Sequence, residues 1–196
     1  SCPQRKKALI TILLFARKYP PCNCGPTNSR RSYWLSRALS EALDADVSIV
    51  AKSLNRGSCA CSASTPEPNV KRVPELGAFG RLPKQTPWAT LRTLLMVMGD
   101  WSSDWPLRAW KLSRSVYRRG EVECVAVTTG PPWIVVVAAF EAKRLRVPLI
   151  VDLQDSPNRY GNLPGWIIRL KRIHRLLVKS ATRTACLISV VNASEQ

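Results

Sequence analysis

Short apolar runs alternate with longer amphipathic segments along this chain. The run over residues 9–15 is continuously apolar and partly β-branched, which is typical of a parallel strand covered on both faces. Shorter apolar runs predict further strands over 47–51, 122–127, 148–153 and 187–191. Apolar residues at helical spacing predict helices between them, the first beginning near Thr27, Asn28 or Ser29 and the others over 88–98, 106–118, 133–145 and 163–179.

This alternation of strands and helices predicts an α/β fold, with a Rossmann-like, doubly wound and mostly parallel sheet flanked by helices. The chain has 196 residues, of which 45% are hydrophobic, so we expect a single domain over 1–196 with one core. Residues 52–87 contain five prolines and no sustained period, and we expect a long mobile insertion there.

The fold class also predicts where a ligand binds. Doubly wound sheets bind ligands beyond the carboxyl ends of their strands. The loops that follow the predicted strands are therefore the candidate positions for a site, and they span residues 19–29, 128–132 and 152–160.

The chain is strongly basic, with 30 Lys plus Arg against 13 Asp plus Glu and a net charge of +17. A field of that sign concentrates polyanions near the surface. Nucleic acid, an anionic membrane face and a phosphorylated small substrate all satisfy this charge, and composition does not separate them. No stretch approaches the ~20 apolar residues that a membrane-spanning helix needs.

Seven cysteines include two C-x-C pairs, Cys22 with Cys24 and Cys59 with Cys61. Structural zinc sites usually separate paired cysteines by ~2–4 residues. The single histidine, His174, lies far along the chain and receives no catalytic role. We expect reduced loop thiols and no metal site, with zinc bound by the four paired thiolates as the alternative.

Four motifs follow one another along the chain. The turn over 19–26 contains Pro20, Pro21 and Gly25, and the helix after it carries Arg30 and Arg31. Asp104-Trp105 heads a later helix, and a Thr-Thr-Gly-Pro-Pro turn spans 128–132. The segment 147–155 ends in Asp-Leu-Gln-Asp, and Ser189-Val190 follows near the end of the chain. In this order, the motifs resemble the N-terminal domain of glycosyltransferase family 4 (group 1), particularly its bacterial polysaccharide-type members, over nearly the whole chain except 52–87.

The resemblance implies the N-terminal, acceptor-side half of a GT-B enzyme that transfers sugar with retention, in polysaccharide biosynthesis. This half presents a glycan or lipid-linked acceptor, while a C-terminal domain binds the nucleotide-sugar donor. We expect that donor-binding domain to be missing here and the chain alone to be inactive. We expect no cofactor and a cytoplasmic location. We expect the basic amphipathic helix over 163–179 to pack its apolar face on the sheet, while its basic edge suits peripheral contact with the anionic inner face of the plasma membrane.

Two candidate site residues lie on loops after predicted strands. Asp155 follows a buried strand, where its carboxylate suits a catalytic contact with an acceptor hydroxyl; a plain turn aspartate is the alternative. Gly25 suits close approach of backbone amides to a phosphate or sugar, with an ordinary loop glycine as the alternative. We expect Asp152, inside the strand end, to hydrogen-bond a neighbouring loop instead.

The remaining candidates are basic or shape the cleft. Arg30 and Arg31 are candidates for contact with an acceptor phosphate, with a solvated helix face as the alternative. Thr129, Gly130 and Pro131 are expected to form the cleft floor.

Two other functions compete with acceptor binding. The net charge of +17 suits a nucleic-acid-binding module, which would bind DNA or RNA in a salt-dependent manner. The basic residues are spread along the chain without a recognised binding motif, so we expect no specific nucleic-acid ligand. A sugar-nucleotide epimerase of GT-B fold has the same architecture, and the missing half would distinguish it.

Overall fold

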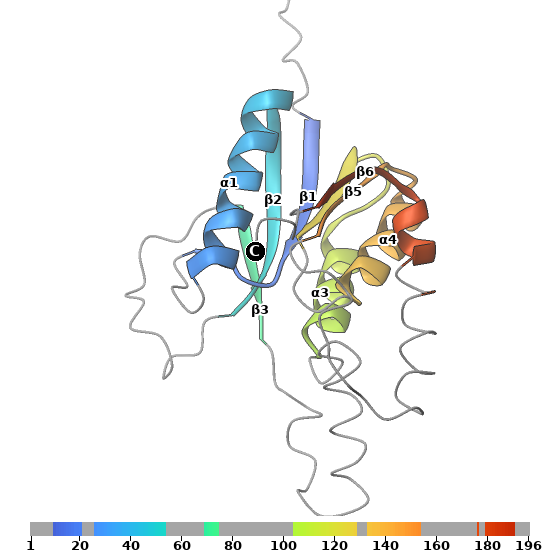
Figure 1. The fold of residues 1–196 in the computed structure, drawn as a ribbon. Coiled ribbons are helices and arrows are strands. Elements are labelled where there is room, and N and C mark those ends of the chain that lie inside the picture. The colour runs from blue at the N-terminus through green and yellow to red at the C-terminus, as the bar shows by residue number, and fades with distance from the viewer. Residues whose placement is uncertain are drawn as a thin grey trace, which may run out of the picture.

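A computed structural model describes residues 10–20, 26–53, 69–74, 104–128, 133–153, 176 and 179–190. Within these residues, six parallel strands form one sheet in the order β3-β2-β1-β4-β5-β6 (Figure 1). The strands are β1 (Ile10–Ala16), β2 (Ala45–Lys52), β3 (Val70–Val73), β4 (Cys124–Thr128), β5 (Leu149–Leu153) and β6 (Ala185–Val190).

The strand order reverses beside β1. The chain runs from β1 outward through β2 to β3, and then returns to the other side of β1 and runs outward through β4 and β5 to β6. This is the order of a doubly wound, Rossmann-like sheet. The predicted α/β fold is therefore confirmed, and its crevice for ligands lies at the carboxyl ends of β1 and β4, where the order reverses.

Helices cover both faces of this sheet (Figure 1). Helix α1 (Pro26–Leu43) packs on one face through Tyr33, Leu35 and Leu39. Helices α3 (Trp105–Val116) and α4 (Ile134–Leu145) pack on the other face. Trp105 heads α3 and is fully buried, so the first residue of that helix anchors it to the sheet.

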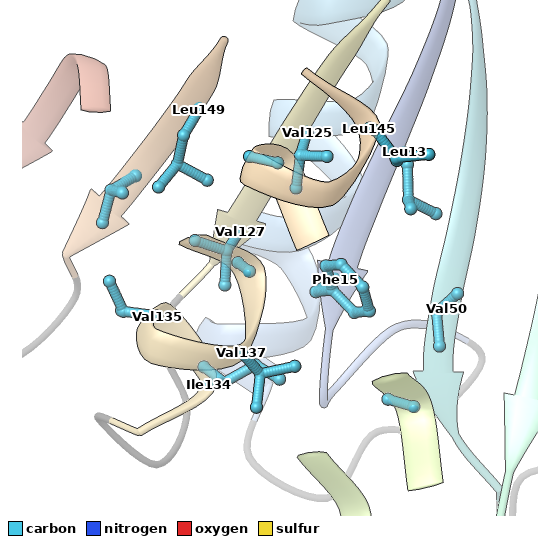
Figure 2. Close-up of a cluster of buried hydrophobic side chains, with 14 of the residues drawn as sticks. Leu13, Phe15, Val50, Val125, Val127, Ile134, Val135, Val137, Leu145 and Leu149 are labelled. Carbon is cyan, nitrogen blue, oxygen red and sulfur yellow. The ribbon is translucent and has the colours of Figure 1, made fainter. Parts of the chain in front are cut away.

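Strand β1 contributes side chains to both cores, which explains why its sequence is apolar without alternation. Leu13 and Phe15 point to the α3–α4 side and lie among Val125, Val127 and the apolar residues of α4 (Figure 2). Ile12 and Leu14 belong to the core under α1. Burying one such side chain contributes roughly 1.5–3 kcal/mol, so β1 is the central support of the fold.

Helix α1 lies close to the sheet through a row of serines. Ser29, Ser32 and Ser36 are all buried, and they recur at the three- and four-residue spacing of one helix face. Small side chains let the helix backbone approach the strands, and their hydroxyls need hydrogen-bond partners once buried. The serine row therefore fixes α1 over the sheet by polar contacts as well as by packing.

A buried carboxylate joins α3 to α4. Glu141 of α4 has no exposed surface and accepts hydrogen bonds from Trp110 Nε1 at 3.1 Å and from the Ser113 hydroxyl, both on α3. Arg144 neutralises it, with Nε 2.9 Å from Oε2, and also donates to the carbonyl of Tyr117 at 2.9 Å. The carboxylate raises the pKa of Arg144 above its ordinary value by hydrogen bonding.

Several predicted boundaries differ from the structure. Strand β3 lies inside the segment predicted to be a mobile insertion, and it pairs in parallel with β2. Helix α1 begins at Pro26, before the predicted start, since proline suits the first turn of a helix. The predicted helix over 88–98 lies outside the described residues. Of the helix predicted over 163–179, the described part continues to residue 183 and so extends past the predicted end.

Candidate functional site

The candidate site lies where the second turn of α1 meets the carboxyl ends of β4 and β5. Thr128 ends β4, and Asp152 lies directly opposite it on β5. Arg31 and Ser32, adjacent on α1, contact these two residues. The sheet thus brings together residues from three segments at the edge where doubly wound folds bind ligands.

Arg31 and Asp152 form a two-point ion pair. Arg31 Nε donates to Asp152 Oδ2 at 2.8 Å, and Nη2 donates to Oδ1. The Asp152 side chain is 4% exposed, whereas that of Arg31 is 32% exposed. Hydrogen bonding to Asp152 raises the pKa of Arg31, against the opposing effect of burial. The expectation that Asp152 bonds a neighbouring loop is wrong, because its partner is on helix α1.

Two buried hydrogen bonds between hydroxyl groups hold α1 at this edge of the sheet. Ser32 Oγ lies 3.1 Å from Thr128 Oγ1. Ser36 Oγ donates to the carbonyl of Tyr33 at 2.7 Å, so the Tyr19 hydroxyl, 3.0 Å away, donates to Ser36. These bonds fix Tyr19, on the segment after β1, and Thr128 at the same edge of the sheet.

The surroundings of the pair are cationic. Basic residues at or just beyond the carboxyl ends of β1, β2 and β3 are Arg17, Lys18, Lys52 and Arg72. Arg72 donates to the carbonyls of Pro20 and Lys52, at 2.5 and 3.2 Å, which ties β3 to the segment after β1. Positive potential at this edge favours an anionic or strongly polar ligand.

The structure describes the positions of two of the predicted site residues, Arg30 and Arg31. Arg31 lies at the carboxyl edge in contact with Asp152, and the neighbouring Arg30 is exposed and has no ion-pair partner within the described residues. The others lie outside the described residues: Gly25, Thr129, Gly130, Pro131 and Asp155.

Sequence reasoning missed the contacts that assemble this edge. Neither Ser32–Thr128 nor Arg31–Asp152 follows from local pattern, since the partners are 96 and 121 positions apart. The sequence does contain one signal of this site. An arginine pair lies early in the first helix and an aspartate lies at a strand end, and the strand order places both at the carboxyl edge of the sheet.

Cys124 is not a candidate for a reactive thiol, because it is buried in the core. Burial raises the pKa of Cys124 to about 11, with a smaller contribution from Cys186. Cys124 is therefore a neutral thiol at physiological pH, and the thiolate is the reactive form. Among the residues with described positions, no cluster of His, Cys, Asp and Glu has the makings of a metal site. The two C-x-C pairs and His174 lie outside those residues.

A cavity of about 400 Å³ lies on the outer side of α4. Its walls are mainly apolar and come from Val136, Phe140, Lys143 and Val147, together with residues 180, 181 and 184. None of these belongs to the Arg31–Asp152 site, so the cavity is separate from the carboxyl-edge cluster.

No protein-family model matches the sequence, and no curated protein matches it. Of the helices with described positions, none is both long and apolar enough to cross a bilayer.

Proposed function

We propose that this chain is the acceptor-binding half of a retaining glycosyltransferase of GT-B fold. In this proposal it receives a glycan or lipid-linked acceptor at the carboxyl edge, while a separate donor-binding domain holds the nucleotide sugar. The enzyme works in the cytoplasm, in peripheral contact with the anionic inner face of the plasma membrane, in polysaccharide biosynthesis.

The observation that carries the proposal is the polar cluster at the carboxyl ends of β4 and β5, next to the point where the strand order reverses. Glycosyl transfer requires that an acceptor hydroxyl be held in a fixed orientation and that negative charge on the departing phosphate be stabilised. The cluster offers an oriented cation at Arg31, and the buried Ser32–Thr128 hydrogen bond holds this turn of α1 against the end of β4. The loops that carry Gly25, Thr129 and Asp155 adjoin the same edge in sequence.

Ligand binding by the chain tests this proposal. Isothermal titration calorimetry with a short-chain prenyl-diphosphate disaccharide, as acceptor mimic, should show saturable binding. A nucleotide sugar should bind weakly or not at all, and the chain alone should transfer no sugar when both are present. Sugar transfer by the isolated chain, or binding of the nucleotide sugar without the acceptor, would contradict the division of labour.

Nucleic-acid binding is the second candidate, and one surface favours it. Trp34 on α1 is 66% exposed, and Arg30 and Arg37 lie four positions before it and three after it on the same helical face. Bases stack on exposed aromatic rings beside basic residues. Titration with a single-stranded oligonucleotide at increasing salt distinguishes the two functions. Saturable binding of the oligonucleotide that Trp34→Ala weakens would support nucleic-acid binding over acceptor binding.

A further inference from the structure

The geometry of the Arg31–Asp152 pair leaves one side of the guanidinium available. Asp152 occupies the edge formed by Nε and Nη2. Arginine presents a second edge, formed by Nη1 and Nη2, and that edge matches the oxygen spacing of carboxylates and phosphates. Within the described part of the chain, no residue accepts a hydrogen bond from Arg31 Nη1.

The burial of the two partners differs in a way that suits a ligand. The carboxylate is 4% exposed and the arginine side chain 32% exposed, so the pair is closed on the Asp152 side and open on the arginine side. A buried carboxylate with two hydrogen bonds holds the guanidinium plane in one orientation. Arg31 is thereby pre-organised, and little rotamer freedom is lost when its open edge binds an anion.

The choice of anion follows from the charge around the pair. Asp104 precedes α3, and Asp152 lies on β5. Each of these two carboxylates already pairs with an arginine. Arg17 and Lys18 follow β1, the strand next to β4, and add positive charge at the same edge of the sheet. An excess of cations around a fork-shaped donor favours a doubly charged phosphate over a single carboxylate.

We infer that the open edge of Arg31, oriented by Asp152, binds a phosphate or diphosphate group of the acceptor. This inference rests on the proposed function and adds that the acceptor is phosphorylated next to its sugar. Arg31 contacts the ligand, and Asp152 is a positioning residue that acts through Arg31.

The direct test observes Arg31 in the unaltered chain. Inorganic diphosphate is titrated into protein labelled with ¹⁵N-arginine, and the Nε–Hε signals are followed by NMR, with Arg31→Lys used for assignment. The Arg31 signal should be protected from exchange by its bond to Asp152 and should shift saturably. The Arg30 signal should not shift. An Arg31 signal that does not move, or that moves no more than that of Arg30, overturns the inference.

Two variants one position apart separate the fork from bulk charge. Arg31→Gln should weaken diphosphate binding by about tenfold or more, whereas Arg30→Gln, with the same loss of charge, should change it by about twofold or less. Arg31→Lys keeps the charge beside Asp152 but lacks the forked guanidinium group, so it should weaken diphosphate binding nearly as much as Arg31→Gln. Circular dichroism should show that the fold of this variant is preserved. Equal effects of Arg30→Gln and Arg31→Gln contradict the inference.

Asp152→Asn tests the positioning role by the sign of its effect. The substitution removes one negative charge and so raises the net charge by one, and a purely electrostatic role for Asp152 therefore predicts tighter diphosphate binding. Loss of orientation predicts weaker binding, by about threefold or more, despite that charge. Tighter binding would mean that Asp152 competes with the ligand, and the proposed arrangement would be wrong.

Three ligands identify the source of the phosphate and separate this inference from the proposed function. The prenyl-diphosphate disaccharide should bind in a manner sensitive to Arg31→Gln, while the free disaccharide should bind weakly to every variant. Binding of the protein to vesicles of phosphatidylglycerol should not change with that substitution. Weaker vesicle binding by Arg31→Gln would show that Arg31 binds a lipid headgroup. If the prenyl-diphosphate disaccharide binds equally well to the Arg31→Gln variant, the inference is refuted but the acceptor function is not. If inorganic diphosphate binds at Arg31 and the prenyl-diphosphate disaccharide does not bind, the acceptor function is refuted but the inference is not.

Discussion

At the scale of single residues, three buried carboxylates in the described part of the chain each pair with an arginine, and Asp104 with Arg108 is the pair at the start of α3. Asp152 pairs with Arg31 at the carboxyl edge, and Glu141 pairs with Arg144 between α3 and α4. The two pairs differ in what surrounds them. Glu141 also receives hydrogen bonds from Trp110 and Ser113, which saturate it within the protein, whereas the arginine of the other pair keeps an edge toward solvent. We therefore assign Glu141 to stability and Arg31 to binding.

Glu141→Leu should destabilise the chain by about 3 kcal/mol, because Arg144, Ser113 and Trp110 lose their common acceptor. Urea unfolding followed by circular dichroism measures the loss. Glu41→Gln is the matched control, since it breaks an exposed pair with Arg37 on α1 and should leave the midpoint unchanged. The double change Glu141→Met with Arg144→Met should recover much of the stability; equal midpoints for Glu141→Leu and the control would refute the assigned role.

At the scale of elements, helix α1 links two parts of the sheet that are distant in sequence. It packs on the strands that flank it, β1 and β2, and its polar face contacts the ends of β4 and β5. The serine row is what permits this, because larger side chains at Ser29, Ser32 and Ser36 would hold the helix away from the strands. The position of α1 therefore sets the geometry of the candidate site.

Ser32→Leu should displace α1 and leave the Thr128 hydroxyl without its partner, at a cost of about 2–4 kcal/mol. Ala38→Leu introduces the same side chain at an exposed position of the same helix, where the change should stay within about 0.5 kcal/mol. Urea unfolding of both variants, with hydrogen exchange of the α1 amides, provides the measurement. Similar losses in the two variants would show that the serine row is not a close-packed contact.

The sequence was sufficient for elements that obey a simple period. The apolar run of β1 predicted a strand buried on both faces, and Leu13 and Phe15 are fully buried as expected. Strand β3 was missed because it has only four residues, two of them the charged Lys71 and Arg72, which suit an edge and not a core. Asp152 was assigned the wrong kind of partner, because pairing across 121 positions depends on the strand order and not on local pattern.

At the scale of the whole molecule, the two edges of the sheet differ in chemistry. Strand β3 forms one edge and carries Lys71 and Arg72, and such charged residues discourage pairing with another chain. Strand β6 forms the other edge, where Leu187 is 56% and Ile188 45% exposed. Their side chains point to opposite faces, since they are neighbours on a strand. Self-association through the described sheet should therefore begin at β6.

Ile188→Lys should lower the tendency of the chain to self-associate, because a charge on an apolar edge strand opposes pairing with a second copy. Sedimentation velocity at increasing protein concentration measures the effect. Leu107→Lys is the control, since Leu107 is 50% exposed on α3, where a single apolar side chain does not create an open edge. Equal behaviour of the two variants would place the association surface elsewhere.

The contacts between α1 and the distant strand ends also have a consequence for the order of assembly. Arg31 leaves the ribosome more than a hundred residues before Asp152, since the two are separated by 121 positions. Helix α1 can form early from local contacts, but Arg31 and Ser32 cannot reach Asp152 and Thr128 until β4 and β5 have joined β1. The candidate site is thus completed after the rest of the amino-terminal half, and a nascent chain should not bind the proposed phosphate until β5 has been synthesised and docked.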